Sequence, residues 1–210
     1  MINKRTLYPK TKRVTKNSAK TIVTEKLDGS NLGFAKVDGE LYVVTRNNIY
    51  KASDRHEKEI KQRMYKGLWS FLEEFGEQLK QDLVDNALIF GEWIAMGRLK
   101  YPESYHLQFH MFAKANVDDE FENVTNMIYD SEHFKYSFVK QFVPIYLETV
   151  PKVCTFNHYP SIEELDELYD HYVYDMNRDV EGFILNQNNQ VLKYVRNKNG
   201  KIEDHVESYK

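Results

Sequence analysis

The alternation of apolar and polar positions along the chain predicts a protein made mainly of short strands. Asp38-Gly39 lies between two apolar runs, and this pair favours the tight turn of a β-hairpin because glycine accepts a positive φ. Asn188-Asn189 joins two further apolar runs in the same way. The predicted strands are Thr21–Glu25, Asn31–Val37, Glu40–Arg46, Ala87–Ala95, Tyr105–Ala113, Val180–Gln187 and Val191–Asn197.

Two segments show helical rather than strand periodicity. In residues 57–85 apolar side chains recur every three or four positions and no proline interrupts them. A second helix is expected from Ser161 to about Met176, with Glu164 at the capping-box position. Strands joined by tight turns, with helices between them, predict an α+β fold with antiparallel sheets and flanking helices. We find no repeat and no Gly/Ser linker, so the sequence predicts a single domain over residues 1–210.

Composition narrows the classes of protein that remain. Cys154 is the only cysteine among the 210 residues, which excludes an intramolecular disulfide and a cysteine-rich metal centre. A single cysteine is typical of a reducing cytoplasm. No apolar run approaches the roughly 18 residues of a membrane helix, so no membrane association is expected.

The charges are unevenly distributed. Lys and Arg number 29 against 32 Asp and Glu, a net charge of −3 that excludes a globally basic nucleic-acid coat protein. Residues 1–20 nevertheless carry seven Lys or Arg and no acid, and residues 193–201 carry four and no acid. Basic ends on a mildly acidic chain indicate contact with a polyanion, and a merely solvated terminus is the alternative for residues 1–20.

The segment Lys26-Leu27-Asp28-Gly29-Ser30-Asn31 carries the clearest chemical signal. A lysine ends a predicted strand, a carboxylate follows two residues later, and Gly29 permits a sharp turn. A lysine amine is a nucleophile only when neutral, a form that burial or a nearby cation favours. From these residues alone, a strand that ends in an Asp-Gly turn with an exposed lysine remains the alternative.

Together with Glu25, this segment resembles the nucleotidyl-acceptor motif of the covalent nucleotidyltransferases: ATP-dependent DNA ligases, RNA ligases and mRNA capping enzymes. Further motifs of that superfamily follow in the same order. They are Thr45-Arg46-Asn47, Phe90-Gly91-Glu92-Trp93, Phe109-His110-Met111-Phe112, Glu181-Gly182-Phe183-Ile184 and Lys193-Tyr194-Val195-Arg196. The resemblance covers residues 22–196 and implies one nucleotidyltransferase (adenylation) domain without an OB-fold or other C-terminal domain.

The resemblance implies a role for each matched residue. Lys26, Glu181 and Lys193 would be catalytic: the nucleophile, the ligand of Mg²⁺ or Mn²⁺, and the contact to the α-phosphate of ATP. Glu92 would bind the ribose, and the alternative for this residue is a buried pair with an arginine. Phe112 would stack on the purine, and the alternative is ordinary packing in the core. The implied nucleotide-binding residues are Glu25, Lys26, Leu27, Asn31, Arg46, Glu92, Phe112 and Lys193.

The last motif departs from the K-x-K form that is common in the superfamily. Val195 occupies the second lysine position and the next cation is Arg196, which on a flat strand points to the face opposite Lys193. A β-bulge would bring the two together. The residues expected to bind nucleic acid are Arg46, Lys10, Lys12, Arg13, Arg196 and Lys198.

Within the superfamily, the chain resembles the RNA ligase 2-like branch. Asn31 replaces the arginine usual in DNA ligases and capping enzymes, and Tyr8-Pro9-Lys10 resembles the N-terminal lead-in of that branch. The implied activity is ATP-dependent sealing of nicked duplex RNA, broken RNA ends or an RNA–DNA hybrid through lysyl-AMP, in the cytoplasm, or the host cytoplasm for a phage-like enzyme. A capping-type guanylyltransferase, a DNA ligase-like adenylyltransferase and a non-catalytic nucleic-acid-binding relative remain alternatives.

Overall fold

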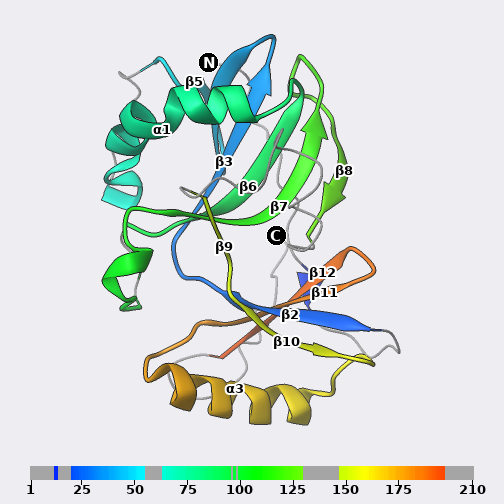
Figure 1. The fold of residues 1–210 in the computed structure, drawn as a ribbon. Helices are drawn as coiled ribbons and strands as arrows, with labels where there is room; N and C mark the ends of the chain where they lie inside the picture. The colour runs from blue at the N-terminus through cyan, green and yellow to red at the C-terminus, as the bar shows by residue number, and fades with distance from the viewer. Residues whose placement is uncertain are drawn as a thin grey trace, which may run out of the picture. The chain divides into compact units, whose positions relative to one another are not determined.

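The computed structural model describes residues 12–13, 20–54, 63–95, 97, 99–129 and 147–196 (Figure 1). The chain forms two compact units, each assembled from separated stretches of sequence. The first unit comprises residues 1–10 and 28–150, and the second comprises residues 11–27 and 151–210. The structure divides the chain into these two units, and the single domain expected over residues 1–210 remains a prediction.

The first unit is built on a seven-stranded sheet. Its strands lie in the order β5 (Ile49–Lys51), β4 (Glu40–Thr45), β3 (Ser30–Val37), β6 (Ala87–Trp93), β7 (Phe109–Val117) and β8 (Val124–Ile128). The short strand β9 (Glu148–Thr149) pairs in parallel with β7, and the other pairs are antiparallel. The predicted hairpin is confirmed, with φ values of 50° and 71° at Asp38 and Gly39.

Helix α1 (Leu68–Asp82) lies across one face of this sheet (Figure 1). Its buried Phe71 stacks on Phe34 of β3 and meets the edge of Trp93 of β6. Alternate residues of the same strands, including Ala35 and Phe90, form a second apolar cluster on the opposite face. We call this second face the Glu92 face, because Glu92 has the same alternation as Phe90.

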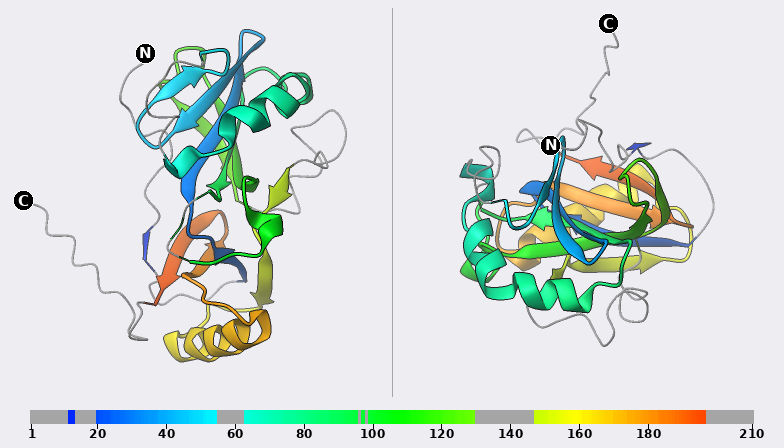
Figure 2. Two further views of the ribbon diagram at one scale, coloured as in Figure 1. Left: turned by 90° about the vertical axis from the view of Figure 1, so that its left-hand side faces the viewer. Right: turned by 90° about the horizontal axis from the view of Figure 1, so that it is seen from above.

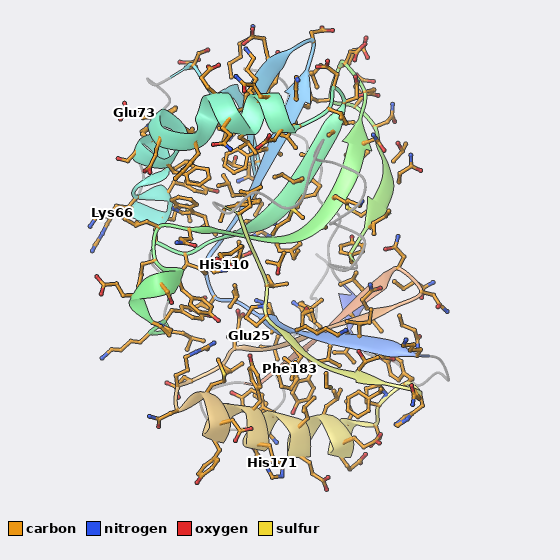
Figure 3. The ribbon with its side chains drawn as sticks, in the orientation of Figure 1. Glu25, Lys66, Glu73, His110, His171 and Phe183 are labelled. Atoms are coloured by element: carbon orange, nitrogen blue, oxygen red, sulfur yellow. The ribbon has the colours of Figure 1, made fainter. Side chains whose placement is uncertain are left out.

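The second unit holds a five-stranded sheet covered on one face by helix α3 (Ile162–Met176), as Figure 2 shows. The strands lie in the order β1 (Lys12–Arg13), β12 (Gln190–Val195), β11 (Gly182–Gln187), β2 (Thr21–Lys26) and β10 (Lys152–Phe156). Leu165 of the helix packs against Phe183 and neighbouring strand residues. Figure 3 shows Phe183 on the helix side of the sheet and His171 on the outward side of α3.

The start of α3 is as the sequence predicts. The Ser161 hydroxyl accepts the backbone N–H of Glu164 at 3.2 Å, and the Glu164 carboxylate accepts the N–H of Ser161 at 2.7 Å. This reciprocal pair satisfies two of the donors that a helix N-terminus leaves open. The helix ends at Met176, and Asn177 after it adopts a left-handed conformation.

Several boundaries differ from the sequence-based expectation. The long helix expected over residues 57–85 is, in its described part, a 3₁₀ turn η1 (Arg63–Tyr65) followed by α1, because Gly67 has a φ of 83° between them. The strand expected from Tyr105 begins at Phe109, because Glu103–Tyr105 forms another 3₁₀ turn, η2. The antiparallel α+β class is confirmed. In the described ranges, no helix has the length and apolar character that crossing a membrane requires.

Candidate active site

The candidate nucleophile lies at the end of β2, just before the chain passes from the second unit to the first. Lys26 is the last residue of β2, and its partner across the ladder is Gly182. Its Nζ lies 2.5 Å from Oε2 of Glu181, and both side chains are half-buried. The structure therefore joins two of the three predicted catalytic residues, which are 155 positions apart in the sequence.

Gly182 allows Glu181 to reach this position. Its φ is 154°, and a Cβ atom there would lie 2.0 Å from the carbonyl oxygen of Tyr194. The peptide next to it is also fixed, because the N–H of Arg196 donates to the carbonyl of Glu181. Strands β11 and β12 approach each other so closely here that a side chain on residue 182 would displace the segment carrying Glu181.

Lys193, the third predicted catalytic residue, lies on the same sheet face as Lys26. Residues directly opposite each other in an antiparallel ladder share a face. Lys193 is opposite Ile184, which is opposite Thr24, two residues before Lys26. This face, which we call the Lys26 face, is the one that α3 does not cover.

The K-x-K departure has a clear structural counterpart. Strand β12 pairs with β11 without a register shift, so no bulge turns Arg196 toward Lys193. Arg196 instead lies on the α3 side, where its guanidinium pairs with Asp166 at 2.8 Å and Asp170 at 2.5 Å. Two carboxylates already compensate this charge, which argues against the nucleic-acid contact expected of Arg196.

Glu25 precedes Lys26 but points to the other face of β2. Its carboxylate is completely buried and accepts hydrogen bonds from Arg178 Nη2 at 2.7 Å and Tyr172 hydroxyl at 2.9 Å. Figure 3 labels Glu25 in this unit. Leu27, which follows Lys26, is buried as well, with 3% exposure. Neither Arg178 nor Tyr172 carries a motif signal in the sequence, so sequence reasoning missed both.

In the first unit, three polar residues form a row across adjacent strands of the Glu92 face. Asn31 of β3 is opposite Glu92 of β6, which is opposite His110 of β7. Phe112 lies two residues beyond His110 at a register irregularity and packs against the apolar cluster of the same face. The structure thus brings together the predicted Asn31, Glu92 and Phe112, and adds His110, which sequence reasoning did not assign.

The loop that carries Asp28 and Gly29 is tied to this row. Glu92 Oε1 accepts the N–H of Gly29 at 3.1 Å, and a Cβ on Gly29 would lie 2.6 Å from the carbonyl of Trp93. The N–H of Asp28 donates to the Tyr101 hydroxyl at 2.6 Å. Tyr101 in turn stacks on Tyr105. The backbone N–H groups of this loop therefore donate to side chains of the protein, Tyr101 and Glu92.

The remaining predicted nucleic-acid contacts are placed in part. Arg46 is exposed in the bend that follows β4. Lys12 and Arg13 form strand β1, whose backbone pairs in parallel with β12 beside Lys193. Lys10 and Lys198 lie outside the described residues. Arg46 is thus the one candidate of this set whose described side chain is open to a polynucleotide.

The carboxylates that are present fit a weakly held divalent cation better than a protein-caged one. In the ranges that the structure describes, no group of three His, Cys, Asp or Glu side chains is placed to hold a metal ion. Mg²⁺ commonly binds through one or two carboxylates together with water and substrate phosphates. Glu181 beside the predicted nucleophile fits such a ligand, because its side chain is 17% exposed.

Known proteins resemble this chain in sequence family and in fold. A model of the RNA ligase family matches residues 19–198. An archaeal ATP-dependent RNA ligase is similar in structure, with a TM-score of 0.54, 18% identity, and coverage of 90% of this chain and 48% of that one. A Naegleria gruberi RNA ligase with PPi is similar as well, with a TM-score of 0.54 and 19% identity. That match covers 84% of this chain and 49% of the Naegleria chain.

A mutant of the Naegleria gruberi RNA ligase with ATP and Mn also matches, with a TM-score of 0.51 and 15% identity over 85% of this chain and 50% of that one. The chain therefore spans about half the length of these structures. At such identities the structural likeness concerns the fold alone. No curated protein sequence gives a significant match.

Proposed function

Because this chain belongs to the RNA ligase family, we propose that it uses ATP to join RNA ends, with Lys26 as the residue that accepts AMP. The observation that carries this proposal is the ion pair between Lys26 and Glu181, with Lys193 on the same sheet face. The sequence motif alone would also fit a strand that ends in an exposed turn. A lysine held at 2.5 Å from a second motif's carboxylate does not fit that alternative.

In the first step, Lys26 Nζ attacks the α-phosphorus of ATP. The Lys26 ammonium first passes one proton to the Glu181 carboxylate or to water, because only the neutral amine can attack. The new N–P bond then forms as the bond from the α-phosphorus to the oxygen shared with the β-phosphate breaks, so pyrophosphate leaves and the nitrogen releases its second proton to water. Glu181 holds the nitrogen in place before attack and accepts hydrogen bonds from it. Lys193 supplies a positive charge on the same face, which suits a transition state whose charge is spread over phosphate oxygens.

Glu181 is also the proposed ligand of Mg²⁺ or Mn²⁺. When bound, such an ion neutralises phosphate charge. The protein's own contribution is the position of the carboxylate, which Gly182 and the Arg196 N–H fix.

The Glu92 face is proposed to bind the nucleoside part of ATP. Glu92 would accept hydrogen bonds from the ribose hydroxyls, Phe112 would stack on the purine, and Asn31 lies beside Glu92 in the row. Arg46 is exposed at the end of β4 and is proposed to meet the incoming strand or the nucleotide sugar. An aromatic ring binds a base by stacking on its face, which suits the role proposed for Phe112.

The later steps would transfer AMP to a 5′-phosphate and then let a 3′-hydroxyl displace AMP, which seals the strand. The substrate class proposed is nicked duplex RNA or broken RNA ends, with an RNA–DNA hybrid as a further substrate, in a cytoplasmic setting. Lys10, Lys12, Arg13 and Lys198 are proposed to contact phosphates, because residues 1–20 and 193–201 contain cations and no acids.

Labelled ATP tests this proposal directly. The protein is incubated with ATP labelled in the α-phosphate and Mg²⁺ or Mn²⁺, then separated on a denaturing gel. We expect a labelled adduct in the parent protein and none in Lys26→Ala. Labelling from GTP in preference to ATP would favour a capping-type enzyme, and a complete lack of adduct would favour a non-catalytic relative.

A further inference from the structure

We propose that Arg178 is a positioning residue for Lys26, acting through its buried ion pair with Glu25. This inference rests on the proposed function, because it concerns how the nucleophile is held. It also gives Glu25 a different role from the nucleotide contact that the sequence resemblance implies.

The geometry of the pair supports this assignment. Arg178 Nη2 lies 2.7 Å from Glu25 Oε2, and the two side chains are 9% and 0% exposed. The Tyr172 hydroxyl donates to the same oxygen, and the other oxygen of Glu25 is also shielded from solvent. A carboxylate enclosed in this way on the α3 side of the sheet has no exposed oxygen to offer a nucleotide.

The positions of these residues in the chain give the pair its effect. Glu25 directly precedes Lys26, and Arg178 comes three residues before Glu181. The same two segments are thus joined twice, once on the α3 side by Glu25 and Arg178 and once on the Lys26 face by Lys26 and Glu181. We call the first of these joints the rear clamp.

Further contacts make the rear clamp rigid. The backbone N–H of Glu25 donates to the carbonyl of Pro151, which fixes the other edge of β2. The Tyr169 hydroxyl donates to the carbonyl of Val180 at 2.6 Å, which fixes the peptide just before Glu181. If a neutral residue replaced Arg178, the buried charge of Glu25 would have no compensating cation. We expect the end of β2 to move so that this carboxylate reaches solvent.

Single-turnover adenylylation at several ATP concentrations separates positioning from binding. In Arg178→Gln and Glu25→Gln we expect the maximal rate to fall about 10- to 100-fold, as for other residues that orient a catalytic group. The ATP concentration for half-maximal rate is expected to stay close to that of the parent. Arg178→Lys, which keeps the charge but not the planar fork, should lie between the parent and Arg178→Gln.

The double variant, with Gln at both positions, should be no slower than the worse single variant, because both changes remove the same joint. A selective rise in the half-maximal ATP concentration in Glu25→Gln would overturn the proposal in favour of a nucleotide contact. An unchanged maximal rate in Arg178→Gln at a temperature where it is folded would also overturn it.

Ser161→Ala is the matched control for general loosening of α3. The Ser161 hydroxyl caps the first turn of this helix by accepting the N–H of Glu164, and this contact involves neither Glu25 nor Arg178. This variant should lower the melting temperature while leaving the adenylylation rate near that of the parent. A rate loss equal to that of Arg178→Gln would show that any damage to α3 has the same effect, and would overturn the proposal.

A second readout needs no ATP, so that failure of the clamp is distinguishable from failure of the proposed function. Limited acetylation followed by mass spectrometry gives the reactivity of Lys26 relative to the exposed Lys20. Glu181→Gln sets the value for a nucleophile without its ion pair. We expect Arg178→Gln to approach that value, and a ratio equal to that of the parent would contradict the clamp even if no AMP adduct ever forms.

Discussion

At the residue scale, two neighbours on one strand have unlike surroundings. Lys26 faces the side of the sheet that carries Lys193, and Glu25 faces the buried side beneath α3. The motif in the sequence identifies both positions, but it does not show which face of the sheet α3 covers. For this reason the sequence predicts Lys26 and Glu181 as partners from their motifs, while the role of Glu25 depends on a contact with Arg178 that has no local signature.

The first residue-scale prediction concerns Gly182. Gly182→Ala would place a methyl group against the Tyr194 carbonyl at a φ that alanine rarely adopts. We expect a loss of about 2–3 kcal/mol in the free energy of unfolding and a slower adenylylation, because the segment with Glu181 must shift. Urea denaturation and single-turnover rates measure the two effects.

Gly39→Ala is the matched control for that substitution. Gly39 also has a positive φ, 71°, but a Cβ there meets nothing within 4 Å. Only backbone strain remains, so we expect a loss of about 1 kcal/mol and an unchanged adenylylation rate. Equal effects of the two substitutions on adenylylation would contradict a special role for the close approach at Gly182.

The second residue-scale prediction separates the two roles proposed for Arg46. This side chain is exposed and lies beyond the end of β4. If it binds an RNA phosphate, Arg46→Ala should leave adenylylation intact, weaken sealing, and reduce the slope of log affinity against log salt by about 1. An increase in the half-maximal ATP concentration without any change in sealing of pre-adenylylated RNA would contradict the RNA contact.

At the scale of elements, strong local signals gave correct predictions. The Asp38-Gly39 hairpin, the capping box of α3 and the Asn188-Asn189 turn all depend on residues close together in sequence, and each is present. The short strands β1, β5, β8, β9 and β10 were not predicted, because two to five residues carry too little periodicity. A glycine inside the helix expected over residues 57–85 marks a point where that helix could divide, and Gly67 does divide it by adopting a left-handed conformation before α1.

The element-scale prediction tests the cap of α3. Ser161→Ala should lower the free energy of unfolding by about 1 kcal/mol at neutral pH. The N–H of Ser161 lowers the pKa of Glu164 below its ordinary value of 4.5, with a further contribution from His158. A carboxyl with a lowered pKa stabilises the fold above its unfolded-state pKa, and that stability is lost as the pH falls through the lower, folded-state value.

The pH dependence provides the check on that prediction. The parent should lose part of its stability as the pH falls below about 4.5, and Glu164→Gln should lack this part. Chemical denaturation at pH 3.5, 4.5 and 7 measures it for the parent and both variants, with pH values chosen around the ordinary carboxyl pKa. A Glu164→Gln curve parallel to that of the parent would contradict the assignment.

At the scale of the whole molecule, the order of motifs along the chain indicated the family, whereas the two-unit organisation was not evident. Each unit is assembled from separate stretches, so no linker or change in composition marks a boundary. The segment from Glu25 to Asn31 contributes to both: its first residues end β2 of one unit and its last begin β3 of the other. The sequence motifs named candidate site residues, but not how these residues divide between two sheets.

The last prediction follows from charge. The chain has a net charge of −3, so binding of RNA must depend on local cations such as Arg46 and those of the basic ends rather than on overall attraction. Each phosphate contact releases counterions, so sealing should fall steeply as salt rises from about 50 to 200 mM. Adenylylation with ATP should fall much less, because buried and half-buried pairs such as Lys26 with Glu181 are poorly screened. Measuring both on one preparation, with pre-adenylylated RNA to isolate the sealing step, makes the comparison internal. Sealing that tolerates salt as well as adenylylation does would mean that apolar or base contacts, not these cations, hold the RNA.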